Sequence, residues 1–308
     1  MLLIIFTVFV GAMLPTQTAI NSKLRSYIIS PMLASMVSFS VAEIFLIVLT
    51  LVMRINPFIS LSFFLSSPKW IWLGGFCGVT ALTSIIFLFQ KLGSVQTVIL
   101  PIIGQIFMGL IIDNFGWFGS RTVPTTLGKI IGGLLMIAGA IFVVVLPSVR
   151  HKMVNKVKTR IWGWQIYGVI IGMLMASQMA INSKLGRMIG SPLHASLVSF
   201  TVGTILLLII VGIKERGYKN ILLGFEKTKP KWIWLGGFLG ATYVLGTVSL
   251  VPILGNSAVV LLTILGQILV SLIIDHFGLL GAVKNRIVRI QIFGTLIMIL
   301  GVTFTKLF

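Results

Sequence analysis

The chain carries one passage twice, and this duplication limits the folds that it can adopt. Residues 17–39 read QTAINSKLRSYIISPMLASMVSF and residues 178–200 read QMAINSKLGRMIGSPLHASLVSF, which agree at 15 of 23 positions. Three further pairs of similar segments keep the same order, at residues 69–76 and 231–238, 104–116 and 266–278, and 133–139 and 295–301. The offset within each pair is 161 or 162 residues, so the chain is a tandem duplication of two halves.

The polarity of the chain places both halves in a membrane. Of the 308 residues, 57% are hydrophobic, 9% are charged and only 5 are acidic. A soluble domain carries about 25% charged residues, and so few charges cannot cover a surface exposed to water. The sequence therefore predicts an all-α integral membrane protein.

A membrane-spanning helix needs about 20 apolar residues, each adding about 1.5 Å of rise. Ten runs satisfy this requirement approximately, at residues 2–20, 33–53, 70–90, 95–113, 130–147, 162–182, 195–213, 232–250, 256–275 and 290–307. We take Lys91 as the break between the third and fourth runs. The pairs Ser30–Pro31 and Ser191–Pro192 are typical of helix starts and predict where the second and seventh spans begin.

The duplication divides these ten spans into two groups of five. We expect residues 1–150 to form the first five-helix repeat, residues 151–161 a basic cytoplasmic connector, and residues 162–308 the second repeat. Because five is odd, equivalent helices of the two repeats must cross the membrane in opposite directions. The predicted architecture is therefore ten transmembrane helices in two inverted repeats, as in many secondary transporters.

The basic residues predict the orientation. The formal charge of +19 comes from 24 Lys and Arg against 5 Asp and Glu. The sequence has no basic cluster interleaved with aromatic residues, so it does not predict a nucleic-acid partner. Instead, 17 of the 24 basic residues lie on the side that is reached after the first span. Cytoplasmic loops are enriched in Lys and Arg. We thus expect the central loop to be cytoplasmic and both termini to lie outside the plasma or inner membrane.

Three motifs of the second half resemble a known family. The segments AINSKLG…GSPLHASLVSF, GGFLGATYVLGTVSLVPILG and LGQILVSLIIDHFGLLG are similar to the YdcZ-like branch of the drug/metabolite transporter superfamily, which is related to EamA-like exporters. The resemblance covers both halves and corresponds to the fused, internally duplicated form. It implies a ten-helix transporter with its path between the halves, and it favours export, but it does not specify a substrate.

Amide side chains inside the spans are the first candidates for a polar path, because polar groups cost free energy in hydrocarbon. Gln17 and Asn21 are four residues apart and share one helical face, and Gln178 and Asn182 repeat this arrangement. These amides either line a path and bind substrate, or hydrogen-bond between helices as packing contacts. Gln105 and Gln267, deeper in the fourth and ninth spans, are further candidates for the path.

Three acidic residues have possible roles in coupling. Glu43 is the one acid placed near the bilayer centre, where it could carry a proton, face a cationic substrate or remain a neutral hydrogen-bonded carboxyl group. Its equivalent in the second half is Thr204, so the acid is not duplicated. Asp113 and Asp275 end the fourth and ninth spans and could act in coupling, or cap and pair at the interface.

Other patterns indicate packing and exclude enzyme classes. The G-x-x-x-G pairs Gly74/Gly78 and Gly236/Gly240 predict close helix packing. No H-E-x-x-H, G-x-S-x-G or complete phosphate-binding loop occurs, and the three histidines and single cysteine are too scattered to indicate a metal site. We expect no enzymatic activity and no cofactor or metal.

These observations lead to one principal expectation and two alternatives. We expect a secondary transporter, favouring export, of small polar or amphipathic metabolites or drugs that works by alternating access. Its partners are the lipid bilayer and a small-molecule substrate, and association into a homodimer is left open. A lipid or lipid-carrier flippase would need a lateral opening between helices. A non-transporting scaffold or accessory subunit would pack its amides without a cavity.

Overall fold

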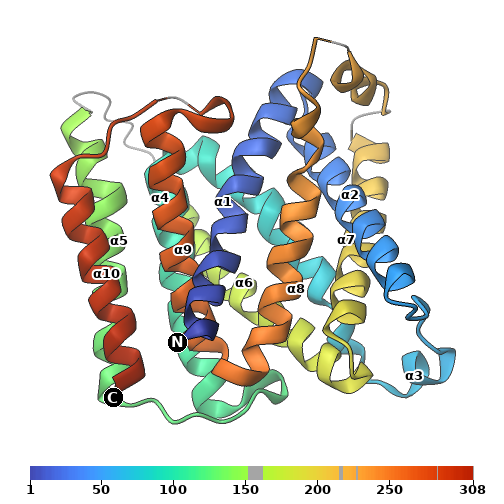
Figure 1. The fold of residues 1–308 in the computed structure, drawn as a ribbon, viewed down its shortest axis with the longest axis horizontal. Helices are drawn as coiled ribbons and strands as arrows, with labels where there is room; N and C mark the ends of the chain where they lie inside the picture. Colours follow the sequence, from blue (N-terminus) through green and yellow to red (C-terminus); the bar gives the residue numbers. More distant parts are fainter. Residues whose placement is uncertain (152–161, 215–217, 227, 283, 308) are drawn as a thin grey trace.

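The computed structural model describes residues 1–151, 162–214, 218–226, 228–282 and 284–307, and these residues form a helical bundle (Figure 1). The long helices are α1 (Leu2–Ile28), α2 (Pro31–Val52), α4 (Gly74–Phe115), α5 (Leu127–His151), α6 (Trp162–Ile189), α7 (Pro192–Lys214), α8 (Gly236–Leu254), α9 (Asn256–Phe277) and α10 (Arg289–Leu307). The short helical segments are α3 (Leu61–Ser66), η1 (Lys69–Trp72), η2 (Trp117–Gly119), η3 (Lys219–Phe225), η4 (Lys231–Trp234) and η5 (Leu279–Gly281). The predicted connector 151–161 lies outside the described residues except for His151.

The helices have the length and polarity of membrane spans. Among the described residues, eight helical segments are long and apolar enough to cross a membrane, and two further apolar helices, Gly74–Ile85 and Arg289–Thr305, are shorter. Large apolar side chains such as Phe9, Leu134 and Ile209 are exposed on the bundle, which suits contact with hydrocarbon and not with water. The expectation of a multi-pass helical membrane protein is thus confirmed.

The predicted helix starts are confirmed by capping contacts. The Ser30 hydroxyl accepts a hydrogen bond from the backbone N–H of Leu33 at 3.0 Å, and α2 begins at the proline that follows. The Ser191 hydroxyl accepts from the N–H of His194 at 3.3 Å at the start of α7. Each serine satisfies one of the free amides that a helix start leaves unpaired.

The predicted break at Lys91 lies between the two arms of a single helical element, α4, so it separates two spans without being a helix end. Lys91 and Leu92 are good helix formers and no proline interrupts the chain before Pro101, so the backbone stays helical. The element nevertheless reverses direction. Its two arms, residues 74–85 and 96–115, both pack along α6, and Figure 1 shows α4 crossing the bundle and returning.

Contacts along α6 establish this reversal. On the first arm, Gly74 lies against Asn182, and further on the Ser84 and Tyr167 hydroxyls are 2.5 Å apart, so the first arm runs antiparallel to α6. On the second arm, Gln165 donates to Gln96 at 3.0 Å, and Gly104 then lies against the backbone of Val169 and Met173. The second arm is therefore parallel to α6, and α4 supplies two crossings of the bundle.

The two halves exchange equivalent contacts. Gly172 packs against Pro101 on α4, and its equivalent Gly11 packs against Thr263 on α9, the counterpart of Pro101. In the same way, α1 packs on α8 and α9 of the second half, whereas α6 packs on both arms of α4 of the first half. The first helix of each half therefore packs against helices of the other half.

Two pairs of equivalent helices lie side by side and antiparallel. In α5 and α10, Gly132 packs against Gly301 while Gly139 packs against Gly294, so residue numbers rise along one helix as they fall along the other. Helices α2 and α7 also pack together, and the rings of Phe39 and its equivalent Phe200 are 5.1 Å apart. Figure 1 shows these pairs at the two ends of the bundle.

Candidate functional site

The amides of α1 lie at a contact between the two halves. Asn21 donates to the Ser38 hydroxyl on α2 at 3.0 Å, and Gln17 donates to the same hydroxyl at 3.4 Å. A Cβ atom added at Gly236 of α8 would overlap Oδ1 of Asn21, and one at Gly240 would lie 2.5 Å from Nε2 of Gln17. The glycine pair of the second half is thus the surface on which these amides rest.

The amides of α6 form the equivalent contact with the first half. Asn182 donates to the Ser199 hydroxyl on α7 at 3.1 Å. A Cβ atom added at Gly74 would overlap Oδ1 of Asn182, and one added at Gly78 would lie 2.8 Å from Nε2 of Gln178. We call these two sets of residues the α1 amide cluster and the α6 amide cluster.

Both clusters confirm the prediction that the glycine pairs allow close packing. The structure also shows that the group packed against each glycine is a side-chain amide of the other half. The two asparagine Oδ1 atoms are buried and have no hydrogen-bond partner among the described residues. Because an unpaired buried polar atom costs free energy, each cluster retains an acceptor that a ligand or water could satisfy after a small rearrangement.

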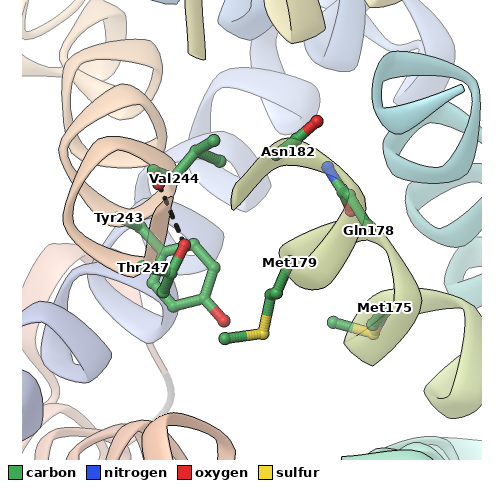
Figure 2. Close-up of a pocket in the computed structure, with 7 residues that line it drawn as sticks. All are labelled: Met175, Gln178, Met179, Asn182, Tyr243, Val244 and Thr247. Atoms are coloured by element: carbon green, nitrogen blue, oxygen red, sulfur yellow. Dashed lines mark hydrogen bonds between the residues drawn. The ribbon is translucent and has the colours of Figure 1, made fainter. Parts of the chain in front are cut away.

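A small cavity of about 40 Å³ adjoins the α6 amide cluster. It lies between α6 and α8 and is lined by Met175, Gln178, Met179, Asn182, Tyr243, Val244 and Thr247 (Figure 2). Figure 2 shows the Tyr243 hydroxyl beside the end of the Met179 side chain, while the Thr247 hydroxyl donates to the Val244 carbonyl at 2.9 Å. This space holds a few water molecules at most.

The structure does not bring all the predicted path residues to one cavity. Gln178 and Asn182 line the cavity between α6 and α8, whereas Gln17 and Asn21 belong to the separate α1 amide cluster. Glu43 lies in the middle of α2, is partly buried, and forms no hydrogen bond with any residue that the structure describes.

Gln105 and Gln267 are also placed away from the cavity lining. Gln105 is 3% exposed, and its Oε1 atom is buried without a partner in the described part of the chain. The Nε2 atom of Gln267 is also buried without a hydrogen-bond partner in the described part of the chain. Both amides therefore lie inside the bundle with one group unsatisfied, consistent with their predicted depth.

The two predicted aspartates have different surroundings. Asp113 is buried, and its carboxylate accepts hydrogen bonds from the backbone N–H groups of Asn256 and Ser257, both at 2.8 Å, and from the Ser257 hydroxyl. Asp275 is exposed and forms no side-chain hydrogen bond within the described ranges. Asp113 thus caps a helix of the other half, a partner that the sequence did not suggest.

A second, larger cavity of about 380 Å³ lies at the edge of the bundle beside α3. Most of its lining is apolar, and it includes Phe58, Phe63 and Ile189. His194 also lines it and is hydrogen-bonded through Nε2 to the Asn56 carbonyl oxygen at 2.6 Å. The seven residues around the small cavity come, by contrast, from two neighbouring long helices, α6 and α8.

Sequence reasoning missed several residues that complete the site. Ser38 and Ser199 lie 17 residues after the asparagines that they bind, inside the duplicated passage, so their repetition was a usable signal. Tyr243 and Thr247 had no such signal, because their equivalents in the first half are Ala81 and Ile85.

The fold and the amide clusters define a class: a multi-pass membrane protein of duplicated halves, with polar groups buried where the halves meet, as in membrane transporters. Comparison of sequences is more specific. Residues 2–142 and 163–304 match the family described as "Putative inner membrane exporter, YdcZ". The chain therefore belongs to the YdcZ family of the drug/metabolite transporters, and the resemblance drawn from its motifs is confirmed.

Comparison of structures supports the fold. Nine chains of solved structures match. One of them, described only as "Crystal structure of protein", superposes with a TM-score of 0.63 over 99% of this chain and 96% of the other, at 14% sequence identity. At such low identity the likeness concerns the fold alone. No curated protein matches the chain.

Proposed function

We propose that this protein is a secondary transporter that exports small polar or amphipathic molecules by alternating access between two inverted repeats. In this proposal α4 contributes two spans, so that α1, α2, the two arms of α4, α5 and α6 to α10 make ten crossings. The family description supports export from the cell across the inner membrane.

The observation that carries the proposal is the antiparallel packing of equivalent helices. Gly132 pairs with Gly301 and Gly139 pairs with Gly294 between α5 and α10. Two copies of one sequence that run in opposite directions are the hallmark of inverted repeats, in which rocking of one repeat against the other exposes a central site to each side in turn. The small size of the central cavity is consistent with a closed conformation.

The chemistry of the cavity supports the proposed class of substrate. Its lining offers amides, a phenol and a hydroxyl group beside two methionine side chains, and it includes no charged residue. Amides and hydroxyl groups donate and accept hydrogen bonds, and methionines adapt to varied apolar shapes. A neutral or weakly cationic molecule with both polar and apolar parts suits this lining better than a strong anion.

The proposed orientation follows from charge. The side with 17 of the 24 basic residues is cytoplasmic, which places the connection between α5 and α6 inside and both termini outside. Figure 1 supports one part of this arrangement, because the two termini lie at the same edge of the bundle and the end of α5 lies at the other.

Transport assays in proteoliposomes test the proposal. The purified chain is reconstituted and offered a panel of neutral, cationic and anionic metabolites and drugs, with and without a pH gradient. We expect uptake or exchange of at least one polar or amphipathic compound, reduced by Asn182→Ala. Thr303→Ala, an exposed hydroxyl on α10 that bonds to its own helix, is the matched control. Absence of uptake and exchange under every gradient would contradict the transporter and favour the scaffold.

Glu43 is the proposed coupling residue in this transporter. Its carboxyl group lies in mid-span, is partly buried and has no hydrogen-bond partner among the described residues, and ionisable groups inside spans often take part in proton relays. Glu43→Gln is expected to make transport insensitive to the pH gradient, and Thr204→Val at the equivalent position is the control. Unchanged gradient dependence in Glu43→Gln would remove Glu43 from the mechanism.

The cavity beside α3 favours a flippase as the second candidate function. Its volume of about 380 Å³ and its largely apolar lining would accept part of a lipid chain at the edge of the bundle. The same proteoliposomes, made with a fluorescent phospholipid in one leaflet, distinguish the two functions. A flippase would move the lipid between leaflets without moving the water-soluble panel.

A further inference from the structure

The cavity of about 380 Å³ beside α3 lies between the two halves of the chain, and its volume is usual for a ligand site. One wall is the segment that leads from α2 into α3, and the other is the corner where α6 ends and α7 begins. None of the lining residues is charged, so the cavity suits an apolar group better than an ion. They are Ile55, Asn56, Phe58, Ile59, Ser60 and Phe63 on the first wall and Met188, Ile189 and His194 on the second.

The equivalent corner at the opposite edge of the bundle is filled. Ile28 and Leu33, where α1 meets α2, are the counterparts of Ile189 and His194. Ile28 is 0% exposed and Leu33 is 1% exposed, and both belong to one buried apolar cluster. A Cβ atom added at Gly224 of η3 would lie 3.4 Å from Cγ2 of Ile28, so η3 lies directly on this corner. Figure 1 shows α3 at one edge of the bundle and η3 at the other.

The two short segments also differ in how their aromatic rings pack. The rings of Phe225 and Trp234 are stacked, with centroids 4.4 Å apart and planes at 26°. A Cβ atom added at Gly224 would lie 2.9 Å from the ring of the same tryptophan. The equivalent rings of Phe63 and Trp72 are 6.1 Å apart and nearly perpendicular, at 79°. Segment η3 is therefore packed tightly on its corner, whereas the segment that contains α3 leaves a space.

His194 accounts for this space. The residue is 8% exposed, and its Nε2 atom lies 2.6 Å from the carbonyl oxygen of Asn56 in the opposite wall. Because a carbonyl oxygen only accepts hydrogen bonds, Nε2 is the donor. The imidazole ring thus joins the start of α7 to the segment before α3 and fixes the separation of the two walls. The counterpart Leu33 has no side-chain donor, so nothing equivalent holds η3 away from its corner.

The surroundings of the cavity are those of a lipid-facing surface. Phe58 is 82% exposed, Leu61 is 70% exposed and Leu65 is 64% exposed, and all three belong to the segment that forms the first wall or to α3 itself. Exposed apolar side chains at the edge of a membrane-spanning bundle suit contact with lipid. A hydrocarbon chain that enters the cavity gains the dispersion contacts that an empty apolar space lacks.

We infer that this cavity binds the acyl chain of a membrane lipid and that His194 is the positioning residue that keeps it open. The site takes lipid only from the leaflet at the edge that carries α3, because η3 fills the counterpart at the other edge. The inference goes beyond the proposed transport and does not rest on it, since the lipid is bound here whether or not the protein moves a compound. It also differs from a flippase, which would release the lipid into the other leaflet.

Photolabelling of the full-length chain tests the inference. The protein is placed in nanodiscs of phosphatidylcholine that contain a small fraction of the same lipid with a diazirine on one acyl chain, so both edges of the bundle meet the probe. After illumination, labelled residues are identified by mass spectrometry. Labelling of Ile189 is divided by that of Leu61 on α3, and labelling of Ile28 by that of Leu222 on η3, since both leucines are 70% exposed. Each ratio compares a corner with its own lipid-facing surface.

We expect the ratio at Ile189 to exceed the ratio at Ile28 about tenfold, the difference expected when a bound chain buries two more methylene groups. His194→Leu, which introduces the residue of the first half, should lower the Ile189 ratio toward that of Ile28. His194→Gln should stay within about twofold of the parent chain, because its amide can still donate to the Asn56 carbonyl. Thr303→Ala on α10 is the control and should leave both ratios unchanged.

A second variant tests the cavity without changing His194. Ile59→Trp fills the space from the opposite wall and should also lower the Ile189 ratio to that of Ile28. Equal ratios at Ile189 and Ile28 in the parent chain, or a ratio that Ile59→Trp leaves unchanged, would overturn the lipid site. An unchanged ratio in His194→Leu, or equal losses in His194→Leu and His194→Gln, would overturn the role of His194. Unfolding temperatures in detergent, measured for every variant, separate these outcomes from misfolding.

Discussion

The two amide clusters have the same partners but different neighbours. In each, an asparagine donates to a serine of the next helix and presses against a glycine of the other half. Only the α6 amide cluster adjoins the central cavity, where Tyr243 and Thr247 add polar groups. The contacts that pack the two halves together are therefore the same in both clusters. The residues that line the cavity differ between the halves. In the proposed transporter, this comparison assigns substrate specificity to the second half and helix packing to both halves.

The largest expected effect concerns packing. Gly74→Ala should lower the free energy of unfolding by about 1–3 kcal/mol, because the new methyl group overlaps the Asn182 side chain and the site is already filled. The measurement is thermal unfolding in detergent. Gly163→Ala is the matched control, since no atom lies within 4 Å of a Cβ atom added there.

The double variant identifies the cause. Asn182→Ala combined with Gly74→Ala removes the overlapping amide and should recover part of the lost stability. If Gly74→Ala were as stable as Gly163→Ala, the close contact between the halves would be absent, and the account of the clusters would be wrong.

The next effect separates the two clusters by function. Asn182→Ala should reduce transport about tenfold, equivalent to ~1.4 kcal/mol, because Asn182 lines the cavity. Asn21→Ala should reduce transport less while lowering stability by a similar amount, since Asn21 makes the same hydrogen bond without the cavity. Initial transport rates at equal protein amounts provide the measurement. Equal losses in both variants would show that the clusters have the same role.

A smaller effect tests the diverged lining. Tyr243→Phe removes one hydroxyl group from the cavity and should weaken apparent substrate affinity about threefold to tenfold, the range expected for one hydrogen bond. The maximal rate should change little. Tyr218→Phe, which removes a hydroxyl bonded to the Leu208 carbonyl outside the site, serves as the comparison. An equal change of affinity in both would exclude Tyr243 from binding.

The smallest effect tests the shared packing. Ser38→Ala removes the hydrogen bonds from Asn21 and, at 3.4 Å, from Gln17, whereas Ser199→Ala removes the one from Asn182. Each such bond contributes about 0.6 kcal/mol in membrane proteins, so Ser38→Ala should be destabilised at least as much as Ser199→Ala in detergent unfolding. A greater loss in Ser199→Ala would mean that the second half relies on its serine for more than packing.

Much of the fold could be predicted from the sequence, because duplication and apolar runs are local signals. The helix starts at Ser30 and Ser191 followed from capping chemistry, and the glycine pairs indicated close packing. The break expected at Lys91 does separate two spans, but it is not a helix end, since a charged residue at a turn does not by itself end a helix. Both arms of α4 pack against α6, a long-range arrangement that no local pattern reports.

The site was harder to predict because it depends on contacts between distant segments. The sequence identified the duplicated amides, but it did not reveal that each amide packs against a glycine of the opposite half. Tyr243 has no counterpart in the first half, so repetition did not mark it. The partner of Asp113 is a backbone helix start 143 residues away in the chain, and backbone N–H groups have no signature in sequence.

The central claim is that the two halves are inverted, and labelling of two equivalent loop residues tests it most directly. Thr122 and Lys284 are 162 positions apart and both exposed. Each is changed to cysteine in a Cys77→Ala background, and intact cells are treated with a membrane-impermeant maleimide. The account predicts that Thr122→Cys is labelled in intact cells and Lys284→Cys only after lysis. Labelling of both residues from the same side would contradict the inverted arrangement.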